Sequence, residues 1–139
     1  MTHRPISILR LALLVFVCAG AAHAQAARWE DHRAEALRAI DAVDYPRAIE
    51  QFEAAIYFAR AQPAADRDIG VLWENLTAAY LADAQYRRVW NAIARWDKVL
   101  AANRGEDWAR DQVSERDRMT RLLFEELRRA RGQAAAEAP

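Results

Sequence analysis

Apolar residues recur at helical spacing along almost the whole chain after residue 28, and this pattern constrains the fold more than any other feature. In the clearest segment they follow one another at intervals of three and four residues: Ile69, Leu72, Trp73, Leu76 and Tyr80. Such spacing places the side chains on one face of an α-helix. The chain also contains only four Gly and four Pro. Because most turns depend on these residues, their scarcity argues against an all-β fold.

The periodicity predicts five helices in a single all-α domain over residues 25–131, followed by a frayed tail over 132–139. Polar residues and prolines between the apolar stripes set the boundaries. The predicted order is a helix over 28–42, a second helix capped by Asp44 with Pro46 in its first turn, a loop over 62–68, a third helix capped by Asp68, a fourth helix ending at Arg104-Gly105, and a fifth over 106–131.

Positions 1–24 have the composition of a secretory signal peptide. Arg4 and Arg10 precede an uncharged apolar run over residues 11–22, and the segment ends in Ala22-His23-Ala24, a small-x-small cleavage pattern. A run of about 12 residues is shorter than the roughly 20 that cross a bilayer, so a retained membrane anchor is the less favoured interpretation. We therefore expect cleavage after Ala24, a periplasmic location in a bacterium, and no membrane attachment afterwards.

Cleavage would remove Cys18, which is the single cysteine of the chain. Disulfides and cysteine-based catalysis or metal binding would be lost with it. The bulky Phe16 and Val17 that precede Cys18 argue against lipid attachment there. Without Arg4 and Arg10 the chain keeps 18 basic and 20 acidic residues. This balance lacks the positive charge of a nucleic-acid-binding protein.

Side chains suited to catalysis are scarce after residue 24. One histidine, His32, and one serine, Ser114, remain, so a Ser-His-Asp or Cys-His set is not expected. His32 and Glu35 alone provide too few ligands for a metal site, and we predict neither a metal nor another cofactor. One enzymatic alternative stays open, in which Glu74, beside Trp73, is the single essential carboxylate of a small glycan hydrolase.

Two segments of the sequence, 44–56 and 85–97, can be aligned with each other. The offset between them equals a unit of about 34 residues plus the loop 63–69, and helix–turn–helix units of that length resemble the tetratricopeptide-repeat family. The resemblance rests on Trp73, Leu76 and Tyr80 in a first helix, and on Asp44-Tyr45, Ala48, Phe52 and Ala55 in a second helix. It covers residues 29–103 and implies an α-solenoid of about two and a half antiparallel repeats, in which the fifth helix would open a third repeat or act as a cap. The alternative fold is an unrelated antiparallel bundle.

The resemblance implies a non-catalytic module that binds a peptide or a helix of another envelope protein in a groove lined by the first helices of the repeats. The corresponding residues here are Arg33, Leu37, Ile40, Asn75, Ala78, Leu81 and Arg110. Some family members bind the terminal carboxylate of a peptide with basic and amide side chains at these positions. Arg33, Asn75 and Arg110 match that arrangement, whereas Leu37 and Glu106 stand where further polar or basic side chains would be needed. A mainly apolar, helix-binding groove therefore fits better. The alternative for Arg33 and Arg110 is pairing with surface carboxylates.

The five tryptophans suggest a further contact surface. Trp73 and Trp96 fit core positions by their spacing, whereas Trp90 falls off the apolar stripe of its helix. Trp90 is a candidate exposed anchor for a partner, or else a core residue tilted between helices. Because an array of two to three repeats buries little surface, we also expect either self-association into a homo-oligomer or docking onto a larger envelope assembly. The alternative function is an oligomerising helical-bundle subunit of an envelope assembly, associating through the fifth helix.

Overall fold

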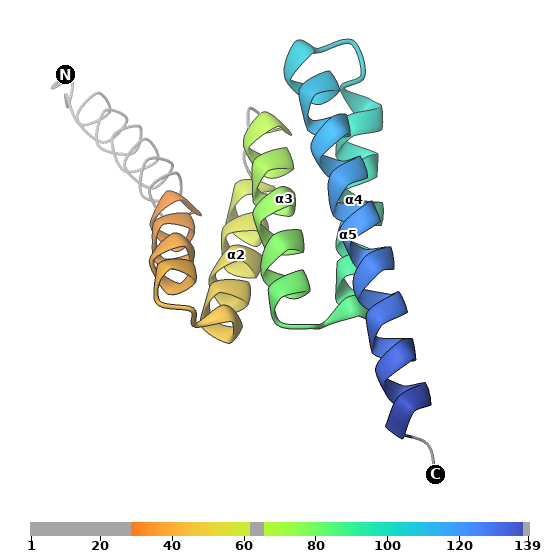
Figure 1. Cartoon of the computed structure of the whole chain (residues 1–139). Coiled ribbons are helices and arrows are strands. Elements are labelled where there is room, and N and C mark those ends of the chain that lie inside the picture. The colour runs from red at the N-terminus through yellow and green to blue at the C-terminus, as the bar shows by residue number, and fades with distance from the viewer. Residues whose placement is uncertain (1–28, 62–65, 138–139) are drawn as a thin grey trace, which may run out of the picture.

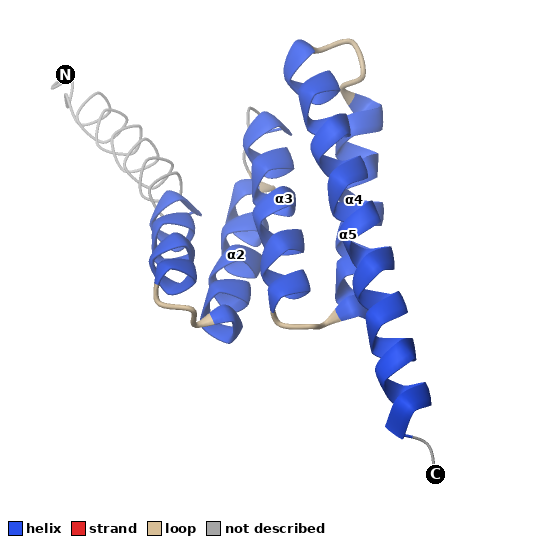
Figure 2. Ribbon diagram, in the orientation of Figure 1, coloured by secondary structure: helices blue, strands red, loops and turns tan. Residues whose placement is uncertain are grey.

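The computed structural model describes residues 29–61 and 66–137, and within these ranges all regular structure is helical (Figures 1 and 2). Residues 29–41 form the first helix. The others are α2 (Tyr45–Ala59), α3 (Asp66–Ala82), α4 (Tyr86–Ala102) and α5 (Asp107–Glu137). Each helix runs antiparallel to the one before it (Figure 1). The predicted all-α class and the five helices are confirmed, while the predicted signal peptide over 1–24 lies outside the described residues.

Two predicted helix boundaries are wrong. Asp68 does not cap the third helix, because α3 already begins at Asp66 and holds both aspartates in its first turn. Negative charge is favourable there, next to the positive end of the helix dipole. Residues 132–137, predicted as frayed, continue α5 to Glu137. Alanines make up half of this segment, and alanine has the highest intrinsic helix propensity.

The predicted start of α2 is confirmed. The backbone N–H of Arg47 donates a hydrogen bond to Asp44 Oδ1 at 3.2 Å, so Asp44 is the N-cap. Pro46 lies in the first turn, where the helix needs no N–H donor from it.

The helix α3 occupies the centre of the array, because it packs against α2, α4 and α5. All five residues of its predicted stripe are buried. Phe52 from α2, Trp96 from α4 and Leu123 from α5 are among the side chains that lose all or nearly all contact with solvent in this core. One continuous core therefore connects all three neighbours of α3.

The two turns that lead into α2 and α4 are built alike. In the first, Val43 and Asp44 donate their N–H groups to the carbonyls three and five residues earlier; in the second, Ala84 and Gln85 do the same, at distances of 2.8–3.2 Å. Val43 and Ala84 have φ angles of 59° and 56°. This left-handed conformation ends many helices and usually falls on glycine. The alignment found in the sequence, which pairs Asp44 with Gln85, therefore relates two turns of the same geometry.

Gly70 provides the space in which α3 and α5 meet. A Cβ at this position would overlap Gln112 Oε1. That oxygen accepts a hydrogen bond of 3.0 Å from Trp96 Nε1, and the Trp96 side chain is fully buried. Because Gly70 of α3 has no side chain, the Gln112 amide of α5 has room to accept the hydrogen bond from the Trp96 indole of α4. The three helices therefore meet at this point.

We predict that Gly70→Ala lowers the free energy of unfolding by about 1 kcal/mol, because Gln112 would have to turn away and leave the Trp96 N–H buried without a partner. An unpaired buried donor costs about 1–3 kcal/mol. The gain from replacing a helical glycine by alanine is at most about 1 kcal/mol. Gly132→Ala is the matched control, since a Cβ there meets nothing within 4 Å and the exchange should not destabilise.

Urea unfolding of a double-mutant cycle checks the cause. In a Gln112→Ala background the obstruction at position 70 is gone, so Gly70→Ala should become neutral or stabilising. A loss of stability of the same size with and without Gln112 would contradict the assignment.

Candidate functional site

Two hollows flank α3, on nearly opposite sides of that helix. The first, here called the α3–α5 hollow, has a volume of about 550 Å³. The second, here called the α2–α4 groove, opens between α2 and α4 over the face of α3 that carries Trp73 and Tyr80. At about 100° per residue, the α3 side chains that line the two hollows point in nearly opposite directions.

The α3–α5 hollow contains two of the predicted groove residues, Ala78 and Leu81, both half-buried. The hollow exists because the alanines of α3 and of the turn after it have short side chains. Longer apolar side chains of α5 form the opposite wall. The full lining is Ala78, Leu81, Ala82, Ala84, Tyr86, Arg118, Met119, Leu122 and Glu126. The hollow is thus mainly apolar, with one cation and one carboxylate among its lining residues.

The other predicted groove residues lie outside this hollow. Leu37 is exposed, Ile40 packs against the core, and Asn75 is half-buried. Arg33 is half-buried, and its Nε has no hydrogen-bond partner in the described part of the chain. Arg110 is exposed and forms an ion pair with Asp107 of its own helix, which is the surface pairing considered as the alternative.

Glu74, the residue of the enzymatic alternative, lies half-buried on α3. Burial raises its pKa, the Glu115 carboxylate of α5 raises it further, and Arg118 opposes both effects. Arg118 also donates hydrogen bonds of 2.9 Å to both carboxylate oxygens of Glu115, which lowers the pKa of Glu115. Glu74 therefore sits next to an established ion pair.

Trp90 is exposed on α4, with 54% of its surface accessible, and Phe124 on α5 is exposed to 50%. Their ring centroids lie 6.2 Å apart at an interplanar angle of 73°, an edge-to-face contact. The two rings form an aromatic patch across the α4–α5 pair, here called the Trp90–Phe124 patch. Trp73 and Trp96 are buried, as their spacing predicts.

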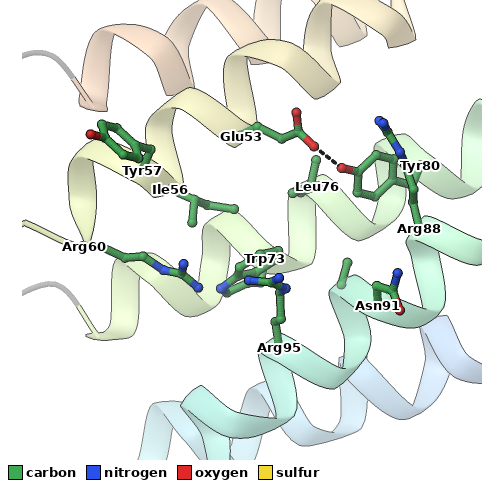
Figure 3. Close-up of a pocket in the computed structure, with 11 residues that line it drawn as sticks. Glu53, Ile56, Tyr57, Arg60, Trp73, Leu76, Tyr80, Arg88, Asn91 and Arg95 are labelled. Carbon is green, nitrogen blue, oxygen red and sulfur yellow. Dashed lines mark hydrogen bonds between the residues drawn. The ribbon is translucent and has the colours of Figure 1, made fainter.

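The α2–α4 groove was missed by the sequence analysis. Its cavity of about 340 Å³ has an aromatic and aliphatic floor and carries guanidinium groups from α4 and from the end of α2 (Figure 3). A second hollow of about 730 Å³ continues it along α4, shares Arg60, Asn91 and Arg95 with it, and adds Asp66, Lys98 and Asn103. The cavity in Figure 3 is lined by Glu53, Ile56, Tyr57, Arg60, Trp73, Leu76, Tyr80, Arg88, Asn91, Ala92 and Arg95.

The arginines of the groove stack on its aromatic rings. The guanidinium carbons of Arg60 and Arg95 lie 5.4 Å and 5.9 Å from the ring centroid of Trp73, and that of Arg88 lies 5.6 Å from Tyr80. These distances are within the range of a cation–π interaction. Figure 3 shows Arg60, the residue that follows α2, and Arg95 from α4 converging on the same indole.

One signal in the sequence could have revealed half of this groove. Arg88, Asn91, Arg95 and Lys98 follow one another at intervals of three and four residues. This spacing defines a polar face on α4 beside its buried stripe. The residues from the α2 side and the aromatic floor from α3 come together only through tertiary packing. The sequence therefore contains no pattern that predicts them.

Tyr80 forms the link between α2 and α3 at one end of the groove. Its hydroxyl donates a hydrogen bond to Glu53 Oε1. Burial and this contact with the carboxylate raise the pKa of Tyr80 to about 12. The phenol therefore keeps its proton far into the alkaline range, and Glu53 is occupied as an acceptor.

No protein-family model matches the chain, and neither a curated protein nor a solved structure matches it. Among the described residues, no helix combines the length and apolarity needed to cross a bilayer. Within the same ranges, no three His, Cys, Asp or Glu side chains are grouped as a metal site.

We predict that the stability supported by Tyr80 is lost at high pH. A raised pKa in the folded state means that this stability is fully present below the ordinary tyrosine pKa of about 10 and disappears as the pH rises through about 12. The free energy of unfolding of Tyr80→Phe should therefore fall less between these values than that of the original chain.

Tyrosinate absorbance provides the second measurement. Glu53→Gln should lower the pKa of Tyr80 but leave it above 10, because burial is the larger cause of the shift. An unchanged transition in Glu53→Gln would contradict the role of the carboxylate.

Proposed function

We propose that this chain is a non-catalytic protein-interaction module, built from tetratricopeptide-like repeats, that works in the bacterial periplasm. The observation that carries the proposal is the α3–α5 hollow, where the predicted groove residues Ala78 and Leu81 face apolar side chains of α5. The proposed ligand is a helix or peptide of another envelope protein.

The repeated turn supports the repeat assignment. Val43 and Ala84 have the same left-handed conformation and their turns the same hydrogen bonds, at positions that the alignment of the two segments pairs. Aligned small and aromatic residues, such as Ala48 and Phe52 in α2, are fully buried between helices. An unrelated bundle would not require two turns of equal geometry at aligned positions.

The shape of the hollow favours a helical ligand. The short side chains of Ala78, Ala82 and Ala84 would let a partner helix approach the α3 side of the hollow closely. Met119 and Leu122 on the α5 side would provide apolar contacts for it. Arg118 and Glu126 supply charges of both signs for the polar edge of such a helix. The C-terminal part of α5 projects beyond the end of α3 (Figure 1), and a helical ligand could contact it there.

The periplasmic location is supported by the sequence of residues 1–24. Two arginines, an uncharged apolar run and the small-x-small pattern ending at Ala24 are the three parts of a cleavable export signal.

A second candidate function is an oligomerising subunit, and the Trp90–Phe124 patch favours it. Two half-exposed aromatic rings in contact on adjacent helices are typical of interface anchors. In this case the partner would be a second copy of the chain, which contacts the outer side of α4 and α5.

We predict that a photo-crosslinker at Leu81 captures one foreign periplasmic protein in living cells. The capture should disappear when Ala78→Arg fills the hollow, and it should persist with Ala101→Arg, an exposed exchange on α4 that lines no hollow. A crosslinker at Glu50, exposed on α2, is the background control. Mass spectrometry identifies the adducts.

The same experiment separates the two candidates. A crosslinker at Trp90 that yields a strong self-adduct, together with no specific foreign adduct at Leu81, would contradict the adaptor and favour the oligomeric subunit.

A further inference from the structure

We propose that the α2–α4 groove binds an acidic peptide segment in an extended conformation. This site lies on the opposite side of α3 from the α3–α5 hollow, so the inference goes beyond the proposed function and does not depend on it. The chain would then hold two different ligands at once, one on each side of its central helix.

The groove is lined by more cationic than acidic side chains. Its two connected hollows contain four cations, Arg60, Arg88, Arg95 and Lys98, against the carboxylates of Glu53 and Asp66. Glu53 accepts the Tyr80 hydroxyl, and Asp66 accepts the amide of Asn103 at 3.2 Å.

None of the four cations forms an ion pair with a carboxylate of the described residues. The ranges 1–28, 62–65 and 138–139, which lie outside them, contain no Asp or Glu. Glu53 and Asp66 line the groove without forming an ion pair with these cations, so we assign the role of counter-ion to a separate molecule.

Two of the cations share one aromatic ring. Arg60 and Arg95 both lie over the indole of Trp73, and two like charges near one ring repel each other, so an anion that contacts both would be favourable. A guanidinium group over a ring can still donate two parallel hydrogen bonds to a carboxylate. The arrangement therefore holds two donors ready for an acidic side chain.

The length of the groove favours a peptide over a small anion such as phosphate. From Arg88 to Lys98 the axis of α4 rises about 15 Å, a span that about five residues of extended, polyproline-like peptide cover. In that conformation every third side chain points the same way, about 9 Å apart, which is close to the rise of about 10 Å between Arg88 and Arg95.

The groove also offers contacts for the rest of such a peptide. Asn91 lies between Arg88 and Arg95 and provides both a donor and an acceptor for peptide backbone. Ile56, Leu76 and Ala92 form an apolar floor. This floor would contact the peptide side chains that lie between the acidic side chains. An acidic peptide with apolar spacers matches these features together, whereas phosphate would use the cations alone.

The test measures binding of a fluorescein-labelled peptide to the purified protein by fluorescence anisotropy. The probe has blocked ends and a glutamate at every third position, with proline and leucine between, and the control peptide has glutamine in place of glutamate. The key variant is Arg95→Ala. Arg87→Ala is the matched control, because Arg87 is exposed on the same helix, lines neither part of the groove and removes the same charge.

We expect Arg95→Ala to weaken binding of the glutamate peptide at least tenfold, Arg87→Ala to change it less than twofold, and added salt to weaken it. Arg60→Ala should act like Arg95→Ala and serves as the second variant if thermal unfolding shows that one of them does not fold. Ala78→Arg should leave peptide binding unchanged, which separates this proposal from the one for the α3–α5 hollow.

Four results would overturn the proposal. These are no binding of the glutamate peptide, equal binding of the glutamine peptide, equal losses in Arg95→Ala and Arg87→Ala, and displacement of the probe by inorganic phosphate at the concentration at which unlabelled peptide displaces it. The last result would assign the groove to a small anion.

Discussion

Burial of α3 between α2, α4 and α5 is the interaction on which the rest of the structure depends. Leu72 and Leu76 of this helix are almost completely removed from solvent. Burying side chains of this size stabilises a fold by about 1.5–3 kcal/mol each. Because α3 has neighbouring helices on three sides, those of its residues that are not in the centre of a helix contact lie at the boundaries between two neighbouring helices. Trp73 and Tyr80 face the α2–α4 groove, and Ala78 and Leu81 face the α3–α5 hollow. One helix therefore positions both candidate binding surfaces.

The same packing explains why aromatic residues of the core also serve the surface. Trp73 and Tyr80 are more than nine-tenths buried, yet each presents a part of its ring to an arginine of a neighbouring helix. A side chain fixed by core packing cannot change its rotamer freely, so the ring that each of these exposed arginines contacts stays in one position. A fixed ring reduces the entropy lost when a ligand binds beside it.

The features that were predictable from the sequence are local ones. Helical stripes appear in the sequence because each face repeats every three to four residues, and Asp44 could be identified as a cap because its partner lies within the first turn of the helix. Arg60, Trp73 and Arg95 lie at the end of α2, on α3 and on α4, and no local rule connects these three parts of the sequence. Arg110 is a related case: its ion pair with Asp107 of the same helix is local, but the register that placed it in a groove came from a family resemblance and stays a prediction. The alanines near the end of α5, which favour helix, extend it to Glu137, beyond the predicted end at residue 131.

Amide hydrogen exchange, followed residue by residue by NMR, tests the central role of α3 most directly. Amides in the middle of the helix, over residues 72–79, should exchange more slowly than any others and only through global unfolding, whereas those beyond residue 125 of α5 should exchange through local opening. Protection of this kind would show that the neighbouring helices fold around α3. If the residues of α3 exchange as fast as the projecting end of α5, or if α4 and α5 remain protected while α2 and α3 open together, the account is contradicted.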